Sequence, residues 1–244
     1  MTTGVWSEAD TASFIRFAQH FVPQRQKQLE VVSTMVGPIG DGLILDLCSG
    51  PGALCSRLLA DHERARVTGL DSSEAMLAES RRVLAEFSGR FTAEKFDLAA
   101  RDWRIRAEAP AAVVSSLAVH HLTGALKRRL YRDVHAMLAP SGTMVIADLV
   151  APVGVRATEL ARREWDDWVR DNSTASGLGA EAYLAFHQTK WSWLQYPDEL
   201  DKPSPLRDQL NWLCEIGFVD VDVYWLQAGH AIFGGIKATE QRNG

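Results

Sequence analysis

The sequence predicts an α/β fold, built on a seven-stranded, mostly parallel sheet with helices on both faces. Between residues 43 and 148, apolar segments of strand length alternate with segments of helical periodicity, as in repeated βαβ units. Near the end of the chain, two alternating segments at 218–225 and 231–236 flank a Gln-Ala-Gly turn. This pattern predicts an antiparallel C-terminal hairpin at the edge of the parallel sheet.

Local signals mark where each predicted element begins and ends. Strands are predicted at 43–47, 67–71, 91–95, 143–148 and from residue 111 up to two histidines at 120 and 121. Helices are predicted at 53–60, 73–87, 124–138 and 205–216, the last of them ended by Gly217. Residues 7–37 predict two further helices, the first capped by Ser7 and broken at Pro23. The helix at 73–87 is expected to bury Met76, Leu77, Val83 and Leu84.

The composition of the 244 residues is that of a globular protein with one sizeable core. A formal net charge of −5 argues against a nucleic-acid partner, since nucleic-acid binders usually carry a basic face. The three cysteines form no C-x-x-C pair, so neither a disulfide framework nor a metal site is predicted. Without a leader or an apolar run of membrane-spanning length, we expect a cytoplasmic protein that contacts no membrane. Whether it is a monomer or a homodimer stays open.

The first strand ends in a turn of small residues, where we expect a cofactor. The row Asp46-x-Cys48-x-Gly50-x-Gly52 leads into the helix at 53–60. Glycines allow a ligand to lie directly against the main chain, and the following helix presents free N–H groups. A dinucleotide fingerprint has three glycines, whereas this row has a cysteine at the first position and an acid before the loop. That acid would repel a pyrophosphate but suits a ligand with an ammonium group.

At this point the chain resembles the class I S-adenosylmethionine-dependent methyltransferases, whose first motif is an acid followed by spaced glycines. A second strand that ends in Asp71 and is followed by Ser72 strengthens the resemblance. The resemblance implies a Rossmann-like sheet, S-adenosylmethionine as cofactor with S-adenosylhomocysteine as product, and Asp71 as the acceptor for the ribose hydroxyls. It also implies that Asp97, rather than Asp102, accepts from the adenine amine.

The resemblance extends the predicted cofactor site along the chain. Phe21 on the N-terminal segment could cover the sulfonium region, and Arg25 could pair with the methionyl carboxylate, although packing and surface exposure explain these two residues equally well. The full predicted cofactor set is Asp46, Cys48, Gly50, Gly52, Asp71, Ser72, Met76, Asp97, Leu98, Ser115, Phe21 and Arg25.

Two histidines, His120 and His121, follow the fourth strand, where parallel sheets deliver side chains to the cofactor crevice. In the small-molecule O-methyltransferases that the chain resembles, a histidine at this place acts as the base, and His120 aligns with it. A histidine suits that role because its ordinary pKa lies near neutral pH. A histidine that only hydrogen-bonds the loop or contacts the cofactor is the alternative. For Asp148, at the end of the fifth strand, a helix cap or a loop salt bridge is the favoured interpretation.

Aromatic residues gather between residues 151 and 205, on two predicted helices that form a lid or an insertion over the crevice. Most such rings pack, but the resemblance implies that this insertion builds part of the acceptor pocket. The residues expected to contact the substrate are Trp165, Trp168, Tyr183, His187 and Trp191.

The sequence therefore predicts one domain with four parts: N-terminal helices (1–37), a cofactor-binding core (38–150), a helical lid (151–205), and a terminal helix with the hairpin (206–244). The predicted function is methyl transfer to a small-molecule acceptor, by O- or N-methylation, through proximity and a general base. The alternatives are an enzyme of the same fold that uses S-adenosylmethionine without methylating, a non-catalytic cofactor-binding protein and, least favoured, an NAD enzyme.

Overall fold

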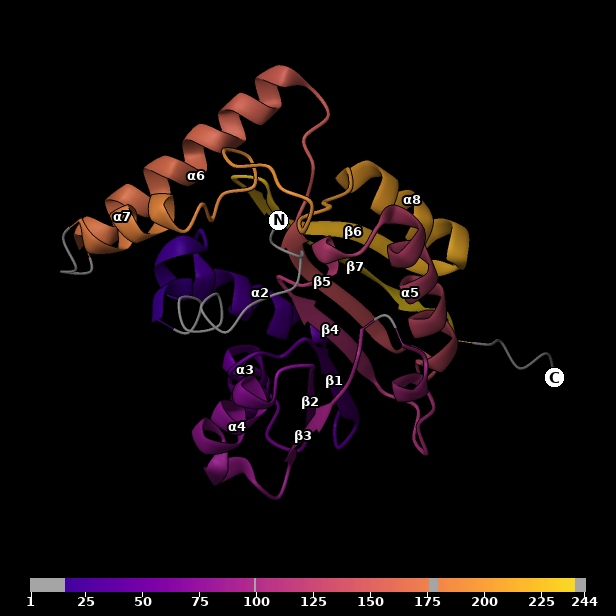
Figure 1. Cartoon of the computed structure of the whole chain (residues 1–244). Coiled ribbons are helices and arrows are strands. Elements are labelled where there is room, and N and C mark those ends of the chain that lie inside the picture. The colour runs from indigo at the N-terminus through magenta and orange to yellow at the C-terminus, as the bar shows by residue number, and fades with distance from the viewer. Residues whose placement is uncertain (1–15, 99, 176–179, 240–244) are drawn as a thin grey trace.

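A seven-stranded sheet forms the centre of the computed structural model, which describes residues 16–98, 100–175 and 180–239 (Figure 1). Its strands are β1 (Leu43–Leu47), β2 (Arg66–Asp71), β3 (Phe91–Lys95), β4 (Ala112–Ser116), β5 (Thr143–Leu149), β6 (Phe218–Gln227) and β7 (His230–Lys237). They lie in the order β3-β2-β1-β4-β5-β7-β6. Strands β1 to β5 pair in parallel, and β7 runs antiparallel to both β5 and β6. The predicted fold class is confirmed.

Helices cover both faces of the sheet (Figure 1). Helices α2 (Arg25–Val36), α3 (Ala53–Asp61) and α4 (Glu74–Val83) pack on one face. Helices α5 (Gly124–Met137) and α8 (Leu206–Ile216) pack together on the other. Residues 16–21 are also helical and end before Pro23, as predicted, whereas the predicted cap Ser7 lies outside the described residues.

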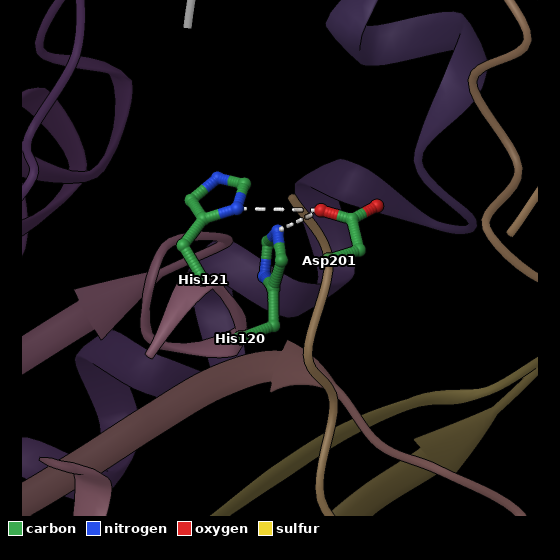
Figure 2. Close-up of side chains that lie close together, drawn as sticks. All are labelled: His120, His121 and Asp201. Atoms are coloured by element: carbon green, nitrogen blue, oxygen red, sulfur yellow. Dashed lines mark ion pairs between the residues drawn. The ribbon is translucent and has the colours of Figure 1, made fainter. Parts of the chain in front are cut away.

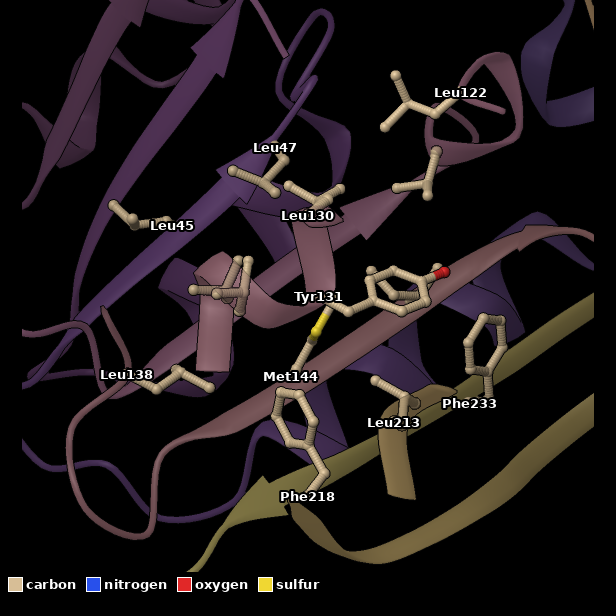
Figure 3. Close-up of a cluster of buried hydrophobic side chains, with 14 of the residues drawn as sticks. Leu45, Leu47, Leu122, Leu130, Tyr131, Leu138, Met144, Leu213, Phe218 and Phe233 are labelled. Atoms are coloured by element: carbon tan, nitrogen blue, oxygen red, sulfur yellow. The ribbon is translucent and has the colours of Figure 1, made fainter. Parts of the chain in front are cut away.

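Alternation along the strands divides the core into two layers. On β1, Leu45 and Leu47 face α5 and α8, whereas Ile44, the residue before Leu45, faces α2 and α3. The first layer, shown in Figure 3, joins the β1 leucines to Leu130 and Tyr131 of α5. Both faces of the parallel strands are therefore apolar, which explains why these strands appear in the sequence as continuous apolar runs.

The predicted helix at 73–87 is shorter in the structure. Ser73 caps α4 by accepting a hydrogen bond from the Met76 N–H, but α4 ends at Val83 and a 3₁₀ turn, η1 (Ala85–Phe87), follows. The expectation that Val83 packs on the sheet is wrong, since Val83 is 44% exposed, whereas Met76, Leu77 and Leu84 are buried as predicted. The change to 3₁₀ geometry shifts which side chains face the sheet.

The fourth strand also ends earlier than predicted. Strand β4 stops at Ser116, Leu117 adopts a left-handed conformation with φ of 57°, and the 3₁₀ turn η3 (Val119–His121) follows. The two histidines therefore lie on a tight turn beyond the strand rather than on the strand itself. Alternation along a strand no longer decides which of the two rings faces the site.

Two helices, α6 (Val155–Ala175) and α7 (Glu181–Gln188), follow β5 in the segment for which a lid is predicted, and they are called the lid helices below (Figure 1). They pack on a third apolar cluster that includes Phe17 and Phe21 of the N-terminal segment and Trp165 of α6. The placement of Trp191 on the second lid helix is wrong, because α7 ends at Gln188 and Trp191 follows in the loop. Within the described residues, no helix is long and apolar enough to span a membrane.

Candidate active site

The turn after β1 is held in a conformation that suits small residues. Gly50 and Gly52 have φ of 54° and 92°, a region that glycine enters without steric cost. Cys48, at the position where a glycine would be ordinary, has φ of 58°. A non-glycine residue in this region stores strain, which proteins retain mainly at functional sites. Helix α3 begins directly after Gly52, so its free N–H groups lie at the turn.

Asp71, at the end of β2, ties the turn to the neighbouring strand. One carboxylate oxygen accepts from the Gly50 N–H at 2.8 Å, and the other accepts from the Ser73 N–H at 2.9 Å. Burial raises the pKa of Asp71, and these backbone hydrogen bonds act in the opposite direction. Each carboxylate oxygen has two lone pairs, so Asp71 can still accept from a ligand hydroxyl.

Asp46 and Arg25 place opposite charges beside the same turn. Burial raises the pKa of Asp46 to about 7, although Arg25 and a hydrogen bond from the Cys55 thiol favour its ionised form. Among the described residues, the second oxygen of Asp46 is buried without a hydrogen-bond partner. The Arg25 guanidinium donates to Ser116 Oγ at 2.6 Å, and burial lowers the pKa of Arg25 to about 10. A carboxylate and a guanidinium side by side are complementary to a zwitterionic amino-acid group.

The other predicted cofactor residues have mixed surroundings. Met76 is buried, whereas Ser72 and Asp97 are exposed and Leu98 is partly buried. The hydroxyl of Ser115 is used internally, because it donates to the Leu47 carbonyl at 2.9 Å. Phe21 is fully buried, packed against Phe17, Phe186 and Trp191 between the N-terminal segment and the lid.

His120 and Asp148 form a buried pair at the ends of β4 and β5. The His120 ring hydrogen-bonds Asp148 through Nδ1, and the His120 backbone N–H donates to the other carboxylate oxygen at 2.7 Å. Asp148 also accepts from its neighbour Leu149 N–H at 2.8 Å. The ion pair with His120 on the η3 turn agrees with the loop salt bridge expected for Asp148, and this carboxylate also fixes the orientation of the histidine ring.

Asp201 completes this cluster and was not predicted from the sequence. Its Oδ1 lies 3.4 Å from His120 Nε2 and 3.3 Å from His121 Nδ1 (Figure 2). The loop that carries Asp201 is attached here by the Lys202 N–H, which donates to the His120 carbonyl at 2.8 Å. No periodicity or motif marks Asp201, and only the folded chain brings it to the histidines.

The surrounding carboxylates determine the charge of His120. Burial disfavours a charged ring, but Asp148 and Asp201 outweigh it and raise the pKa of His120 to about 9. The two histidines in turn hold the pKa of Asp201 below its ordinary value, against the effect of burial. At neutral pH this arrangement favours an imidazolium whose two N–H groups face the two carboxylates.

The predicted substrate residues divide into a packing group and a polar group. Trp165 is 1% exposed, packs on His230 and donates its indole N–H to the Phe21 carbonyl at 2.7 Å, and Trp168 lies at the edge of this cluster. In the polar group, Asp166 accepts from the Tyr183 hydroxyl at 3.0 Å and contacts His187 Nε2 at 3.0 Å.

Comparisons with known proteins agree with this architecture. Residues 44–142 match a family model described as a methyltransferase domain. No curated protein matches the chain. Among solved structures, an O-methyltransferase family protein from Burkholderia thailandensis superposes with a TM-score of 0.64 at 12% identity, over 96% of this chain and 60% of its own.

Two further solved structures are about as similar. A phosphoethanolamine N-methyltransferase 2 from Haemonchus contortus, in complex with S-adenosyl-L-methionine, has a TM-score of 0.64 at 14% identity, over 96% of this chain and 58% of its own. The CurJ carbon methyltransferase has a TM-score of 0.65 at 12% identity, over 97% of this chain and 61% of its own. The chain thus spans about 60% of the length of the structures that it matches.

The sheet order and the reversed β7 define a Rossmann-like α/β fold, and the turn after β1 lies at the carboxyl ends of its parallel strands. Residues 44–142 match the methyltransferase-domain model, and the chain has the fold of the solved methyltransferases to which it is similar. The cofactor that a methyltransferase domain implies is S-adenosylmethionine. The residues present fit this cofactor, since Asp46 and Arg25 match the charges of its amino-acid part and Asp71 retains acceptor capacity for a ribose.

Proposed function

We propose that this chain transfers the methyl group of S-adenosylmethionine to an oxygen or nitrogen atom of a small-molecule acceptor. The observation that carries the proposal is the arrangement of two sites along one edge of the sheet. Asp71 and the glycine turn lie at the ends of β2 and β1, and the His120–Asp148 pair lies at the ends of β4 and β5.

The bound cofactor would supply a sulfonium methyl group, which reacts by in-line displacement and needs little covalent help from the protein. The residues of this chain then have three tasks: to hold the donor, to place the acceptor and to handle the proton that the acceptor loses. Asp71, Asp46 and Arg25 are the residues proposed for the first task. The lid helices α6 and α7 are proposed to form part of the acceptor site and to exclude water.

His120 is the residue proposed to contact the reacting end of the acceptor. The sequence-based expectation gave it the role of general base, which requires a neutral ring with a free lone pair on one nitrogen. In the described structure, Asp148 faces one ring nitrogen and Asp201 faces the other. Proton acceptance by His120 Nε2 therefore requires that Asp201 first move away or that another group take its place.

A second candidate function has the same donor site but no methylated product. An enzyme of this fold could use the sulfonium charge without transferring the methyl group, and a binding protein could hold the cofactor without catalysis. The O-, N- and carbon methyltransferases among the structural neighbours do not identify the acceptor atom, since all three superpose about equally well.

Two measurements test the proposal in order. Calorimetry with S-adenosylhomocysteine should give one cofactor site per chain, and absence of binding would contradict the donor site. The chain is then incubated with S-adenosylmethionine and a panel of phenols, carboxylic acids and amines. Mass spectrometry should show that the mass of one acceptor increases by that of a methylene group as S-adenosylhomocysteine is released. Cofactor binding with neither S-adenosylhomocysteine release nor a methylated acceptor would support the non-methylating alternative instead.

A further inference from the structure

The cluster of His120, His121 and Asp201 has the composition and spacing of a metal site. Three potential ligand atoms, His120 Nε2, His121 Nδ1 and Asp201 Oδ1, all lie within 4.8 Å of one another. The two distances to Asp201 Oδ1 are 3.4 and 3.3 Å. Ligands that surround one ion at about 2.1 Å are separated from their neighbours by about 3.0–3.5 Å. The two nitrogen–oxygen pairs already have this separation, and Figure 2 shows both rings turned toward the carboxylate.

Neighbouring groups hold these ligands in place without an ion. Asp148 binds the opposite nitrogen of the His120 ring and so directs Nε2 toward Asp201. A carboxylate behind a ligating histidine is the usual second-shell arrangement at metal sites, where it fixes the tautomer and the ring orientation.

The loop that carries Asp201 is fixed at several points. Beside the Lys202 contact with His120, the buried Lys127 ammonium donates to Ser204 Oγ at 2.9 Å, and Ser204 accepts from the Ala151 N–H at 3.1 Å through its carbonyl. On the N-terminal side of Asp201, the Asp198 carboxylate accepts hydrogen bonds from the Leu200 and Asp201 N–H groups. Asp201 is thus delivered to the histidines by a constrained segment rather than by a freely moving side chain.

The charges favour a divalent ion. With both imidazoles neutral, Asp148 and Asp201 contribute two negative charges to a largely buried cluster, and burial of uncompensated charge is costly. An ion of charge +2 balances both carboxylates, whereas a single proton leaves one negative charge.

The accessibility of the ligands is that of an open site. The His120 side chain is 7% exposed, but those of Asp201 and His121 are 16% and 27% exposed, so solvent reaches one side of the cluster. Three protein ligands with one accessible side are typical of catalytic metal sites, where water or substrate takes the remaining position. The cluster lies at the end of β4, where the acceptor is proposed to bind.

We propose that His120 Nε2, His121 Nδ1 and Asp201 Oδ1 bind a divalent first-row transition metal ion, and that the acceptor oxygen completes its coordination. Two imidazoles and one carboxylate suit such ions better than Mg²⁺ or Ca²⁺, which prefer all-oxygen sites. The ion would lower the pKa of a bound hydroxyl, so that its proton passes to solvent water on the open side of the cluster. The oxygen would then form a bond to the methyl carbon as the bond from that carbon to the cofactor's sulfur breaks, with S-adenosylhomocysteine as the leaving group. The ion site is independent of the donor site, and only its purpose rests on the proposed function.

The test is metal binding by the full chain after chelation. Isothermal titration with Zn²⁺ and with Mn²⁺ should show one ion per chain, and Co²⁺ should give an absorption spectrum of a site with nitrogen and oxygen ligands. Asp201→Asn and His121→Ala should each weaken binding by at least about 10- to 100-fold. His62→Gln is the matched control, because His62 also lies beside an aspartate, Asp61, but at the end of α3. It should bind metal like the wild type.

Binding of S-adenosylhomocysteine to the same samples shows whether each variant is folded and separates the two proposals. Cofactor binding without metal binding would overturn the metal site and leave the proposed function standing. Metal binding without cofactor binding would do the reverse. Metal binding that persists unchanged in both Asp201→Asn and His121→Ala would also overturn the assignment, because the ion would then be held elsewhere. Should His121→Ala fail to fold, Asp201→Asn and the Co²⁺ spectrum decide the question.

Discussion

The two ends of the proposed active site are held by different groups, backbone N–H groups at one end and charged side chains at the other. At the ends of β1 and β2, backbone N–H groups of Gly50 and Ser73 hold Asp71, and glycine dihedral angles shape the turn. At the ends of β4 and β5, charged side chains hold one another, and one of them, Asp201, arrives from a distant loop. A short sequence motif is enough to predict a site that the backbone forms, whereas a site that side chains form depends on the complete fold.

The largest effect that would sharpen this comparison is expected at the side-chain end. His120→Ala should lower turnover by about 10²–10⁴-fold, the usual range for a positioned group that handles a proton, and leave donor affinity unchanged. Steady-state kinetics and calorimetry with S-adenosylhomocysteine measure the two quantities. A loss of donor affinity without loss of turnover would break the division between the two ends. If His121→Ala were damaging and His120→Ala silent, the neighbouring ring would be the one that faces the acceptor.

The backbone end should respond in the opposite way. Asp71→Ala removes the acceptor of two backbone N–H groups and of the proposed ribose contact, so donor affinity should fall by roughly 10- to 150-fold, or about 1.5–3 kcal/mol. Gly50→Val should be worse, because a branched side chain is strained at φ of 54°. Asp41→Ala, an exposed aspartate far from the turn, is the control. Unchanged affinity in Asp71→Ala would show that Asp71 is not the ribose ligand.

A third expectation concerns His230 at the start of β7, behind the lid. Burial lowers the pKa of His230 to about 4, against an unfolded value near 6.5, so the folded chain holds this ring neutral. The contribution of the neutral His230 ring to the free energy of unfolding is fully present above pH 6.5. It decreases as the pH falls from 6.5 toward 4, and about 2 kcal/mol of it is lost at pH 5. Urea unfolding at pH 7 and pH 5 should show that His230→Gln loses less stability than the wild type. An equal loss in both proteins would contradict a neutral buried ring.

A smaller effect separates packing from recognition within the lid. Trp165→Phe leaves the Phe21 carbonyl without its donor and should cost about 1–3 kcal/mol of folding free energy, with donor affinity unchanged. Trp193→Phe is the matched control, because the Trp193 indole nitrogen has no hydrogen-bond partner among the described residues. Thermal unfolding compares the two variants. Equal losses of stability would mean that the hydrogen bond between Trp165 and Phe21 contributes little.

The smallest expected signal is a change in the exchange of the lid. Amide hydrogens of α6 and α7 should exchange more slowly when S-adenosylhomocysteine and an acceptor are both bound, because the site must open to load and then exclude water. Protection that is equal in all states would identify the lid as a fixed packing element.

The parts of this molecule that the sequence could predict are those set by local rules. Strand β3 has the predicted bounds, and the turn that ends at Gly52 follows β1, as the small residues of the sequence predicted. Local rules failed where tertiary contacts compete with them. Val83 carries helical periodicity but sits where α4 gives way to a 3₁₀ turn, and Trp191 continues the spacing of α7 after the helix has ended.

The histidine cluster shows more clearly what cannot be predicted from the sequence. Chain position was enough to single out His120 and His121, because parallel strands bring their carboxyl ends to one edge. It could not supply Asp201, because that residue reaches the histidines on a loop that runs from the end of α7 to η3. The protonation of His120 followed from its carboxylate partners, which is why the expectation of a neutral base could not take it into account.

The reversed direction of β7 has a practical consequence. Its first residue, His230, pairs with Leu149 near the proposed active site, and its last, Lys237, bonds to Gly142 at the opposite edge. There the Lys237 ammonium also donates to the Leu138 carbonyl at 2.7 Å, which anchors the strand end to α5. A dye, surface linker or fused domain attached beyond Lys237 would therefore leave the molecule with its catalytic edge turned away from the attachment point. Immobilised preparations can thus be loaded with cofactor and acceptor without obstruction by the support.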